Sequence, residues 1–175
     1  MVKKYLSFIL MLLALSCFSQ EAKTIFDVAR SGTLNEASEL FKKNPKIVNS
    51  INEAGYSPLI LACYRGNTEV AKFLIKNGAD LNYNNEMGTP LMAAVVKNNL
   101  EIVNLLIDKN VNVELKDGNG TTALIYASMF KNHEVAKLLI KAKANYETKD
   151  NRGNSAIDYA ILADDDQLIQ ILKTK

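Results

Sequence analysis

Short apolar segments, each opened by a Ser or Thr and closed by a polar break, recur along most of the chain. The four clearest segments are residues 57–66, 89–98, 122–131 and 155–164. After each of the first three breaks, apolar residues return at helical spacing: residues 69–82, 101–114 and 134–147. In the first of these, Val70, Leu74 and Ile75 share one face of a helix. The pattern therefore predicts pairs of short helices joined by tight turns.

The pattern repeats with a nearly constant period. Alanines occupy the same place in the four short segments, separated by 32, 33 and 33 residues: Ala62, Ala94, Ala127 and Ala160. A degenerate copy lies at residues 25–49, with Gly32 in the place of Gly66. Such self-similarity is typical of repeat proteins, whose terminal units are atypical because they cap the stack. We divide the chain into five units, the last truncated: residues 21–52, 53–84, 85–117, 118–150 and 151–175.

Individual residues predict where the helices begin and end. Ser or Thr is a natural N-cap at the start of each short segment: Ser57, Thr89, Thr122 and Ser155. Gly78 follows a second helix and suits a left-handed C-cap. Later units have Asn110 and Lys143 in its place; Asn tolerates that conformation, whereas Lys is either strained there or belongs to a differently built turn. The turn at residues 84–88 is one residue shorter than its equivalents, so we expect it to be tighter.

The segments SPLILACYRG and TPLMAAVVKN, followed by EVAKFLIKNGADLN, resemble the ankyrin repeat family. The resemblance covers residues 21–175. It implies an all-α fold, an ankyrin-repeat α-solenoid of about five helix-turn-helix units with β-turn fingers between them. The family pattern is not kept everywhere, because its mid-repeat glycine survives at Gly66 but is replaced in later units by Asn98, Lys131 and Asp164.

The beginning of the chain differs from the repeats. Lys3 and Lys4 precede an apolar run from Leu6 to Phe18, which is typical of a secretory signal peptide. We expect a signal peptide over residues 1–19, cleaved after Ser19, and an ankyrin domain over residues 20–175. The alternatives are lipidation at Cys17, since the residues before it resemble a lipobox, and an uncleaved anchor. The predicted localisation is therefore periplasmic or secreted, with no membrane span after cleavage.

Composition and charge narrow the function. The chain is 48% hydrophobic and 23% charged, enough apolar material for a core. Removing Lys3 and Lys4 lowers the Lys+Arg count from 21 to 19, equal to the 19 Asp+Glu. A neutral chain without a basic face is a poor nucleic-acid binder. Cleavage also leaves Cys63 as the single cysteine, which excludes an internal disulfide.

Candidate chemistry is sparse. His133 is the only histidine and starts a second helix, so we expect a surface or capping role. Cys63 sits beside Ala62 at a core position, and one His with one Cys makes no His/Cys metal cluster. The run at residues 164–166 is DDD, which suits a helix N-terminus. The alternative is a carboxylate site for a cation such as Ca²⁺. We predict no enzyme activity and no cofactor.

Residues that the repeat does not dictate are candidates for partner binding. In relatives, the finger tips and the end of the first helix line a concave face. One helix-end position is apolar or aromatic in four successive units, either exposed as a row or packed between repeats: Tyr64, Val96, Met129 and Leu162. The predicted partner-binding residues are Tyr56, Tyr64, Arg65, Val96, Lys97, Met129 and Phe130. The other finger-tip candidates are Glu53, Ala54, Glu86, Met87, Gly118, Asn119, Thr121, Asn151, Arg152 and Asn154.

The resemblance and these residues predict an exported, non-catalytic scaffold that binds a protein partner of unknown identity through its concave face. We expect a monomer. Two alternatives remain open: an immunity-like inhibitor or accessory factor for a toxin or enzyme, and a carboxylate-based metal-binding protein.

Overall fold

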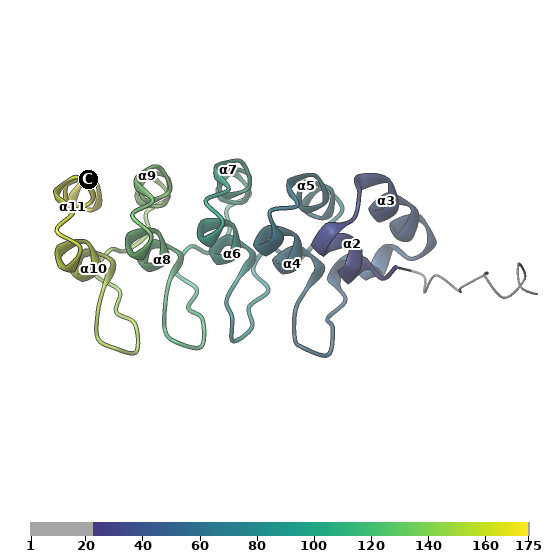
Figure 1. Ribbon diagram of the computed structural model, residues 1–175, viewed down its shortest axis with the longest axis horizontal. Coiled ribbons are helices and arrows are strands. Elements are labelled where there is room, and N and C mark those ends of the chain that lie inside the picture. Colours follow the sequence, from purple (N-terminus) through teal and green to yellow (C-terminus); the bar gives the residue numbers. More distant parts are fainter. Residues whose placement is uncertain (1–22, 175) are drawn as a thin grey trace, which may run out of the picture.

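The computed structural model describes residues 23–174, so the expected signal peptide, Ser19 and Cys17 lie outside the described residues. Two rows of antiparallel helices run the length of the molecule (Figure 1). The first row consists of α2 (Ile25–Ser31), α4 (Pro58–Arg65), α6 (Pro90–Val96), α8 (Ala123–Met129) and α10 (Ala156–Leu162). The second consists of α3 (Leu34–Lys43), α5 (Thr68–Lys76), α7 (Leu100–Asp108), α9 (His133–Lys141) and α11 (Asp166–Lys173), with a 3₁₀ helix, η1, at Pro45–Asn49. The predicted all-α solenoid is confirmed.

The first-row helices begin where the sequence predicts. At each predicted N-cap the hydroxyl oxygen accepts a hydrogen bond from the backbone N–H three residues later: Ser57, Thr89, Thr122 and Ser155. Pro58 and Pro90 follow directly, at positions where a missing N–H costs nothing. The first N–H groups of a helix have no hydrogen-bond acceptor within the helix, and these caps supply one. Helices of only seven or eight residues therefore have defined starting points.

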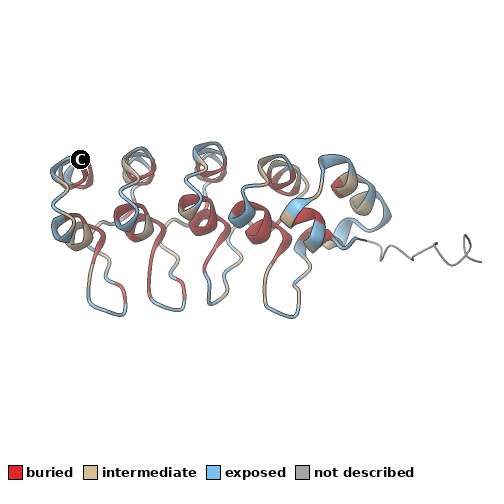
Figure 2. Cartoon of the chain, viewed as in Figure 1, coloured by how far each residue is buried: buried red, intermediate tan, exposed pale blue. Residues whose placement is uncertain are grey.

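The core lies between the two rows and between successive units (Figure 2). The four repeating alanines are fully buried, and their small side chains let neighbouring first-row helices approach closely. Asparagine side chains add hydrogen bonds between units: Nδ2 of Asn67 donates to the carbonyl oxygens of Val28 (3.2 Å) and Gly32 (2.9 Å). Within residues 23–174, no helix is long and apolar enough to cross a membrane.

Left-handed turns close the helices. Gly78 adopts this conformation (φ 84°), as predicted. Asn110 (57°) adopts it too, and so does Lys143 (65°), for which the sequence had left a different turn open. The residues in the place of Gly66 adopt it as well: Asn98, Lys131 and Asp164. Gly32 is the exception, because its φ of −87° is open to any residue. Glycine is required there by crowding, since a Cβ would lie 2.6 Å from Cα of Val28.

The fingers project from one side of the stack (Figure 1). In three of them the N–H of the first residue bonds to the carbonyl four residues later: Asn52 to Tyr56, Asp117 to Thr121, and Asp150 to Asn154. In the remaining finger, Asn85 pairs with Gly88, three residues later. The predicted tighter turn is thus confirmed.

Neighbouring finger tips are hydrogen-bonded to each other. The N–H of Gly118 donates to the carbonyl of Glu86 (3.0 Å), and the N–H of Asn151 donates to the carbonyl of Asn119 (2.9 Å). These bonds join the last three fingers, and Nδ2 of Asn85 donates to the carbonyl of Gly55 in the first finger (2.8 Å). The fingers thus form one wall beside the first-row helices.

Candidate partner-binding groove

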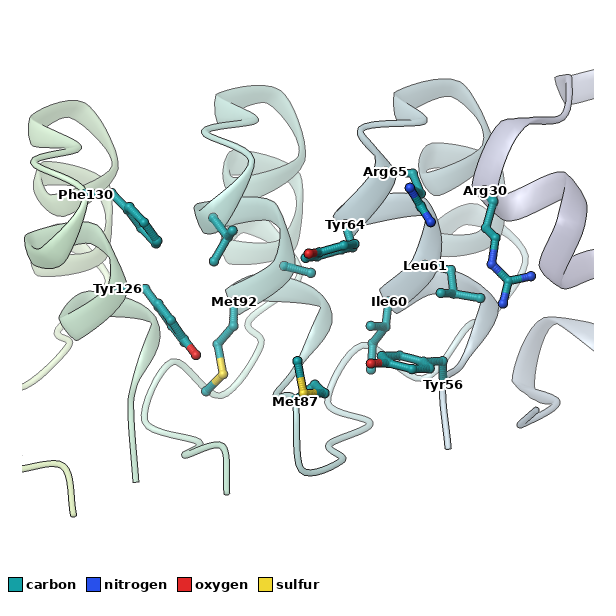
Figure 3. A pocket seen from close by; sticks show the side chains of 12 residues that line it. Arg30, Tyr56, Ile60, Leu61, Tyr64, Arg65, Met87, Met92, Tyr126 and Phe130 are labelled. Carbon is teal, nitrogen blue, oxygen red and sulfur yellow. The ribbon is translucent and has the colours of Figure 1, made fainter. Parts of the chain in front are cut away.

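A groove with a volume of about 370 Å³ lies between the fingers and helices α4, α6 and α8 (Figure 3). Its lining comes from units one to four and is mostly apolar or aromatic: Arg30, Tyr56, Ile60, Leu61, Tyr64, Arg65, Met87, Met92, Ala93, Val96, Tyr126 and Phe130. Because the residues come from four units, the stacking of the repeats creates the groove.

The groove has a buried floor and an exposed rim. Ile60 and Met92 are almost completely buried and form the floor. At the rim, Tyr64 is 51% exposed, Met87 65% and Phe130 50%. Three large apolar side chains are therefore available to a ligand, above a floor that the core holds in place.

Tyr126 links the groove to a finger. Its ring stacks on Phe130, with ring centroids 6.2 Å apart and an interplanar angle of 5°. Its hydroxyl donates a 2.7 Å hydrogen bond to Oδ2 of Asp117, at the base of the finger. Burial and the adjacent Asp117 carboxylate both raise the pKa of Tyr126, which keeps the phenol protonated. The stack thus holds Phe130 at the rim.

A second Tyr–Asp pair occurs one unit later. The hydroxyl of Tyr159 donates a 2.6 Å hydrogen bond to Oδ2 of Asp150. Burial raises the pKa of Asp150, but hydrogen bonds from Tyr159 and from the N–H groups of Asn154 and Arg152 outweigh it and lower the pKa overall. A shallow hollow of about 170 Å³ lies beside this pair and includes Met129 in its lining.

The charged residues that line the groove are both cationic. Arg30 forms an exposed 3.5 Å ion pair with Asp27, on its own helix. Arg65 forms no ion pair with any other residue between Lys23 and Thr174. The groove therefore combines an apolar interior with positive charge at the end nearest unit one.

Comparison with known proteins decides the family. The chain matches the family described as Ankyrin repeats (3 copies) over residues 25–117 and again over residues 109–175. The chain belongs to the ankyrin repeat family. Ankyrin repeats are typically protein-interaction scaffolds and are generally non-catalytic.

Several curated ankyrin proteins are similar to part of this chain. Rat ankyrin repeat and SAM domain-containing protein 6 is 33% identical over 101 residues, which is 57% of this chain and 11% of the relative. A putative ankyrin repeat protein of fowlpox virus is 34% identical over 105 residues, covering 59% and 24%. Human ankyrin repeat and KH domain-containing protein 1 is 45% identical over 76 residues, covering 42% and 3%. The chain thus spans a quarter or less of each relative's length.

The ankyrin fold brings most of the predicted binding residues together. Tyr56, Tyr64, Arg65, Val96 and Phe130 all line the groove. Two predicted residues lie elsewhere. Met129 faces the neighbouring hollow, and Lys97 is exposed at the C-cap of α6 and lines neither cavity.

The helix-end row is exposed along most of its length. Tyr64, Met129 and Leu162 are exposed, whereas Val96 is half-buried. The alternative, that the row is packed between repeats, therefore applies only to Val96. One finger-tip candidate, Thr121, is largely buried, although it is among the residues that line the neighbouring hollow. Its backbone N–H and C=O both bond to Asp117.

Sequence reasoning missed part of the lining. Ile60 and Met92 follow the core pattern of ankyrin helices, so nothing in their spacing marked them as groove residues. Tyr126 did carry a signal. An aspartate precedes a tyrosine by nine residues in two successive units, and both pairs are hydrogen-bonded.

The other candidate residues, Cys63, His133 and the aspartate run, lie in the core or at a helix end. Cys63 is fully buried, and burial raises the pKa of its thiol to about 12. Nε2 of His133 lies 2.8 Å from Oδ2 of Asp165, which also caps α11. The contact with His133 and the N–H of Leu168 lower the pKa of Asp165. In the described part of the chain, no three His, Cys, Asp or Glu residues are grouped as a metal site would require.

Proposed function

We propose that this ankyrin protein is a non-catalytic scaffold that binds a protein partner in the groove between α4, α6, α8 and the fingers. The observation that carries the proposal is the exposure of Tyr64, Met87 and Phe130 around a preformed apolar floor. Grouped exposed apolar side chains mark interaction sites, and Tyr, Met, Phe and Arg are enriched in protein interfaces.

The groove favours a partner of particular chemistry. Its apolar floor suits an aliphatic or aromatic side chain that is buried on binding. Arg65 and Arg30 suit a carboxylate next to that anchor, since arginine binds carboxylates in a planar, two-pronged geometry. We therefore propose a partner segment with an apolar anchor and at least one acidic neighbour.

Crosslinking in the producing cells tests this location. A photoreactive amino acid replaces Tyr64 in the groove or, as a control, the exposed Lys109 at the end of α7 in the second row. We expect a protein adduct from position 64 and none from position 109. Equal adducts from both positions, or adducts only from position 109, would place the binding surface elsewhere.

Substitution tests the anchors once the adduct identifies the partner. Tyr64→Ala and Phe130→Ala should each weaken binding about tenfold or more, the usual effect of removing an interface hot spot. Leu100→Ala is the matched control, because Leu100 is an exposed apolar residue of the second row. Circular dichroism shows whether the variants stay folded, and binding unchanged in both groove variants would contradict the proposal.

We also propose that the protein is exported, on the strength of residues 1–19 alone. The mass of the protein recovered from its producing cells tests this. Cleavage after Ser19 leaves a chain that starts at Gln20, and lipidation leaves one that starts at a modified Cys17. A full-length mass would contradict export by either route.

A further inference from the structure

The C-terminal ends of the first-row helices carry one basic residue in each of the first four units. Arg65 and Lys97 share one position, directly before the left-handed turn, and Lys131 is itself the turn residue of the fourth unit. In the first unit, Arg30 occupies the position of Tyr64. Because neighbouring helices pack about 8–10 Å apart, these side chains form a row with about that spacing, which we call the cationic row: Arg30, Arg65, Lys97 and Lys131.

The positive charge of the cationic row is not neutralised within residues 23–174. Arg65, Lys97 and Lys131 form no ion pair with any of these residues, and Nζ of Lys131 keeps its charge while it donates to a backbone carbonyl of unit five (3.2 Å). The pair of Arg30 with Asp27 is long and exposed, and such pairs contribute little. The acidic residues at the starts of the second-row helices are held by lysines of those helices: Glu69 and Glu101 by Lys72, and Glu134 by Lys137.

The cationic row runs along one edge of the groove. Figure 3 shows Tyr64, Arg65 and Phe130 on the side of the helix ends, and Tyr56 and Met87 on the side of the fingers. A ligand in the groove therefore lies beside the cationic row along its length, and touches exposed aromatic side chains at the same edge.

The charges around the cationic row determine which edge of the groove attracts an anion. Glu53 and Glu86 are exposed at the finger tips, on the opposite edge. In the fifth unit, Asp164 takes the place of Lys131, so the row ends with the fourth unit. An anionic ligand is therefore attracted to the helix ends of units one to four and repelled by the finger tips.

We propose, as a deepening that rests on the proposed function, that the partner segment is an extended polyproline II stretch with an acidic residue at every third position. A polyproline II helix has three residues per turn and rises about 3.1 Å per residue, so every third side chain lies on one face, about 9.3 Å from the next. This spacing matches the cationic row. In a β-strand, residues on one face recur about every 6.6 Å and would fall out of register with it.

The aromatic lining of the groove favours the same conformation. Four lining residues are aromatic and come from units two and four: Tyr56, Tyr64, Tyr126 and Phe130. Proline-rich segments dock in aromatic-lined grooves because their polyproline II helix is already formed and loses little entropy on binding. An α-helix also returns to one face after seven residues, about 10.5 Å, so a helical peptide is the competing probe.

Fluorescence anisotropy of labelled peptides with the purified protein tests the proposal. The periodic peptide is proline-rich, with glutamate at every third position and one leucine as the apolar anchor. The shuffled peptide has the same residues with the glutamates in one block. We expect the periodic peptide to bind at least about tenfold more tightly than the shuffled one. Its affinity should fall as salt is added, because the contacts join exposed charges.

Substitutions assign this binding to the cationic row. Arg65→Gln and Lys97→Gln should each weaken binding of the periodic peptide about two- to fivefold, as expected for an exposed ion pair, and together about tenfold. Lys109→Gln is the matched control. Lys109, like Lys97, is an exposed lysine at the C-cap of a helix, so both variants lose the same interaction with a helix dipole. Lys109 lies in the second row, and its loss should leave binding unchanged, with circular dichroism confirming that all variants are folded.

The outcomes separate this inference from the proposed function. Lys97 lines neither cavity, so its effect on binding reports the cationic row and not the groove. The inference is overturned if the periodic peptide does not bind, or if Lys97→Gln behaves like Lys109→Gln. It is also overturned if the shuffled peptide, a helical peptide with glutamate at every seventh position, or an oligothymidylate strand binds as tightly as the periodic peptide. In each of these cases a crosslinked adduct at position 64 would leave the proposed function standing, whereas periodic-peptide binding that Tyr64→Ala leaves unchanged would contradict the groove itself.

Discussion

The hydroxyl of Tyr126 donates a 2.7 Å hydrogen bond to Oδ2 of Asp117, nine residues earlier in the chain. Oδ1 of the same carboxylate accepts hydrogen bonds from the N–H groups of Asn119 and Thr121. One carboxylate therefore shapes the finger and attaches it to α8. Since Tyr126 also stacks on Phe130, the finger, the helix and the groove rim are fixed together.

Removing this hydroxyl should destabilise the fold. Tyr126→Phe leaves the buried Asp117 carboxylate without one partner, and a hydrogen bond to a charged group contributes about 1.5–3 kcal/mol. We expect a loss of about that size in the free energy of unfolding, measured with urea at neutral pH. Tyr64→Phe is the control, because the Tyr64 hydroxyl bonds to nothing within residues 23–174 and its removal should have no effect. If both variants lost the same free energy of unfolding, the hydrogen bond to Asp117 would contribute nothing to stability.

Local rules made the helices predictable from the sequence. The N-caps, the left-handed turns and the short finger each depend on a few neighbouring residues, and all appear where the pattern places them. The groove depends on side chains from four units, so its floor could not be separated from the ordinary core. Ile60 and Met92 look like core residues in the sequence because they are buried; only the stacking places them at the floor of a groove.

The left-handed turn at the end of each second helix offers a matched pair of substitutions. Lys143 adopts φ 65° at the position where Gly78 adopts 84°. A non-glycine residue in this region is strained by roughly 1 kcal/mol, so Lys143→Gly should stabilise the protein by up to about that amount. Gly78→Ala should destabilise it comparably. A Cβ on Gly78 meets nothing within 4 Å, so backbone conformation alone would be responsible.

Thermal unfolding of the two variants measures this prediction. The expected result is a higher midpoint for Lys143→Gly and a lower midpoint for Gly78→Ala. If both variants lowered the midpoint, the entropy of glycine in the unfolded chain would outweigh the strain, and the prediction would be wrong.

Burial of Cys63 predicts a specific loss of stability at alkaline pH. Its folded pKa of about 12 exceeds the value of about 8.5 expected in the unfolded chain. The unfolded state therefore loses this proton first. The stability contribution is complete below about pH 8.5 and declines between there and pH 12, by up to about 1.4 kcal/mol per pH unit.

The difference in the free energy of unfolding between the wild type and Cys63→Ala isolates the effect of the thiol. The other titrating groups are present in both proteins, so their contributions cancel. At neutral pH the variant should be less stable than the wild type, since alanine leaves a small cavity. The difference should shrink steadily as the pH rises above about 9. A difference that stays constant up to about pH 11 would show that the buried thiol does not govern alkaline stability.

Ser128 should be a position at which the protein can be made more stable. Its side chain is fully buried, and its hydroxyl has no hydrogen-bond partner among the described residues. Unit two has Cys63 at the same position, so the repeat tolerates a thiol in place of this hydroxyl. Ser128→Cys removes a buried hydroxyl without a partner and should raise the free energy of unfolding by about 1 kcal/mol, measured with urea.

Ser155→Ala is the control and should lower the free energy of unfolding by about 1 kcal/mol. Ser155 is also buried, but its hydroxyl caps α10. A buried serine therefore stabilises this fold when its hydroxyl oxygen accepts a hydrogen bond from a backbone N–H, and destabilises it when the hydroxyl has no partner. A destabilised Ser128→Cys would show that the Ser128 hydroxyl is satisfied after all.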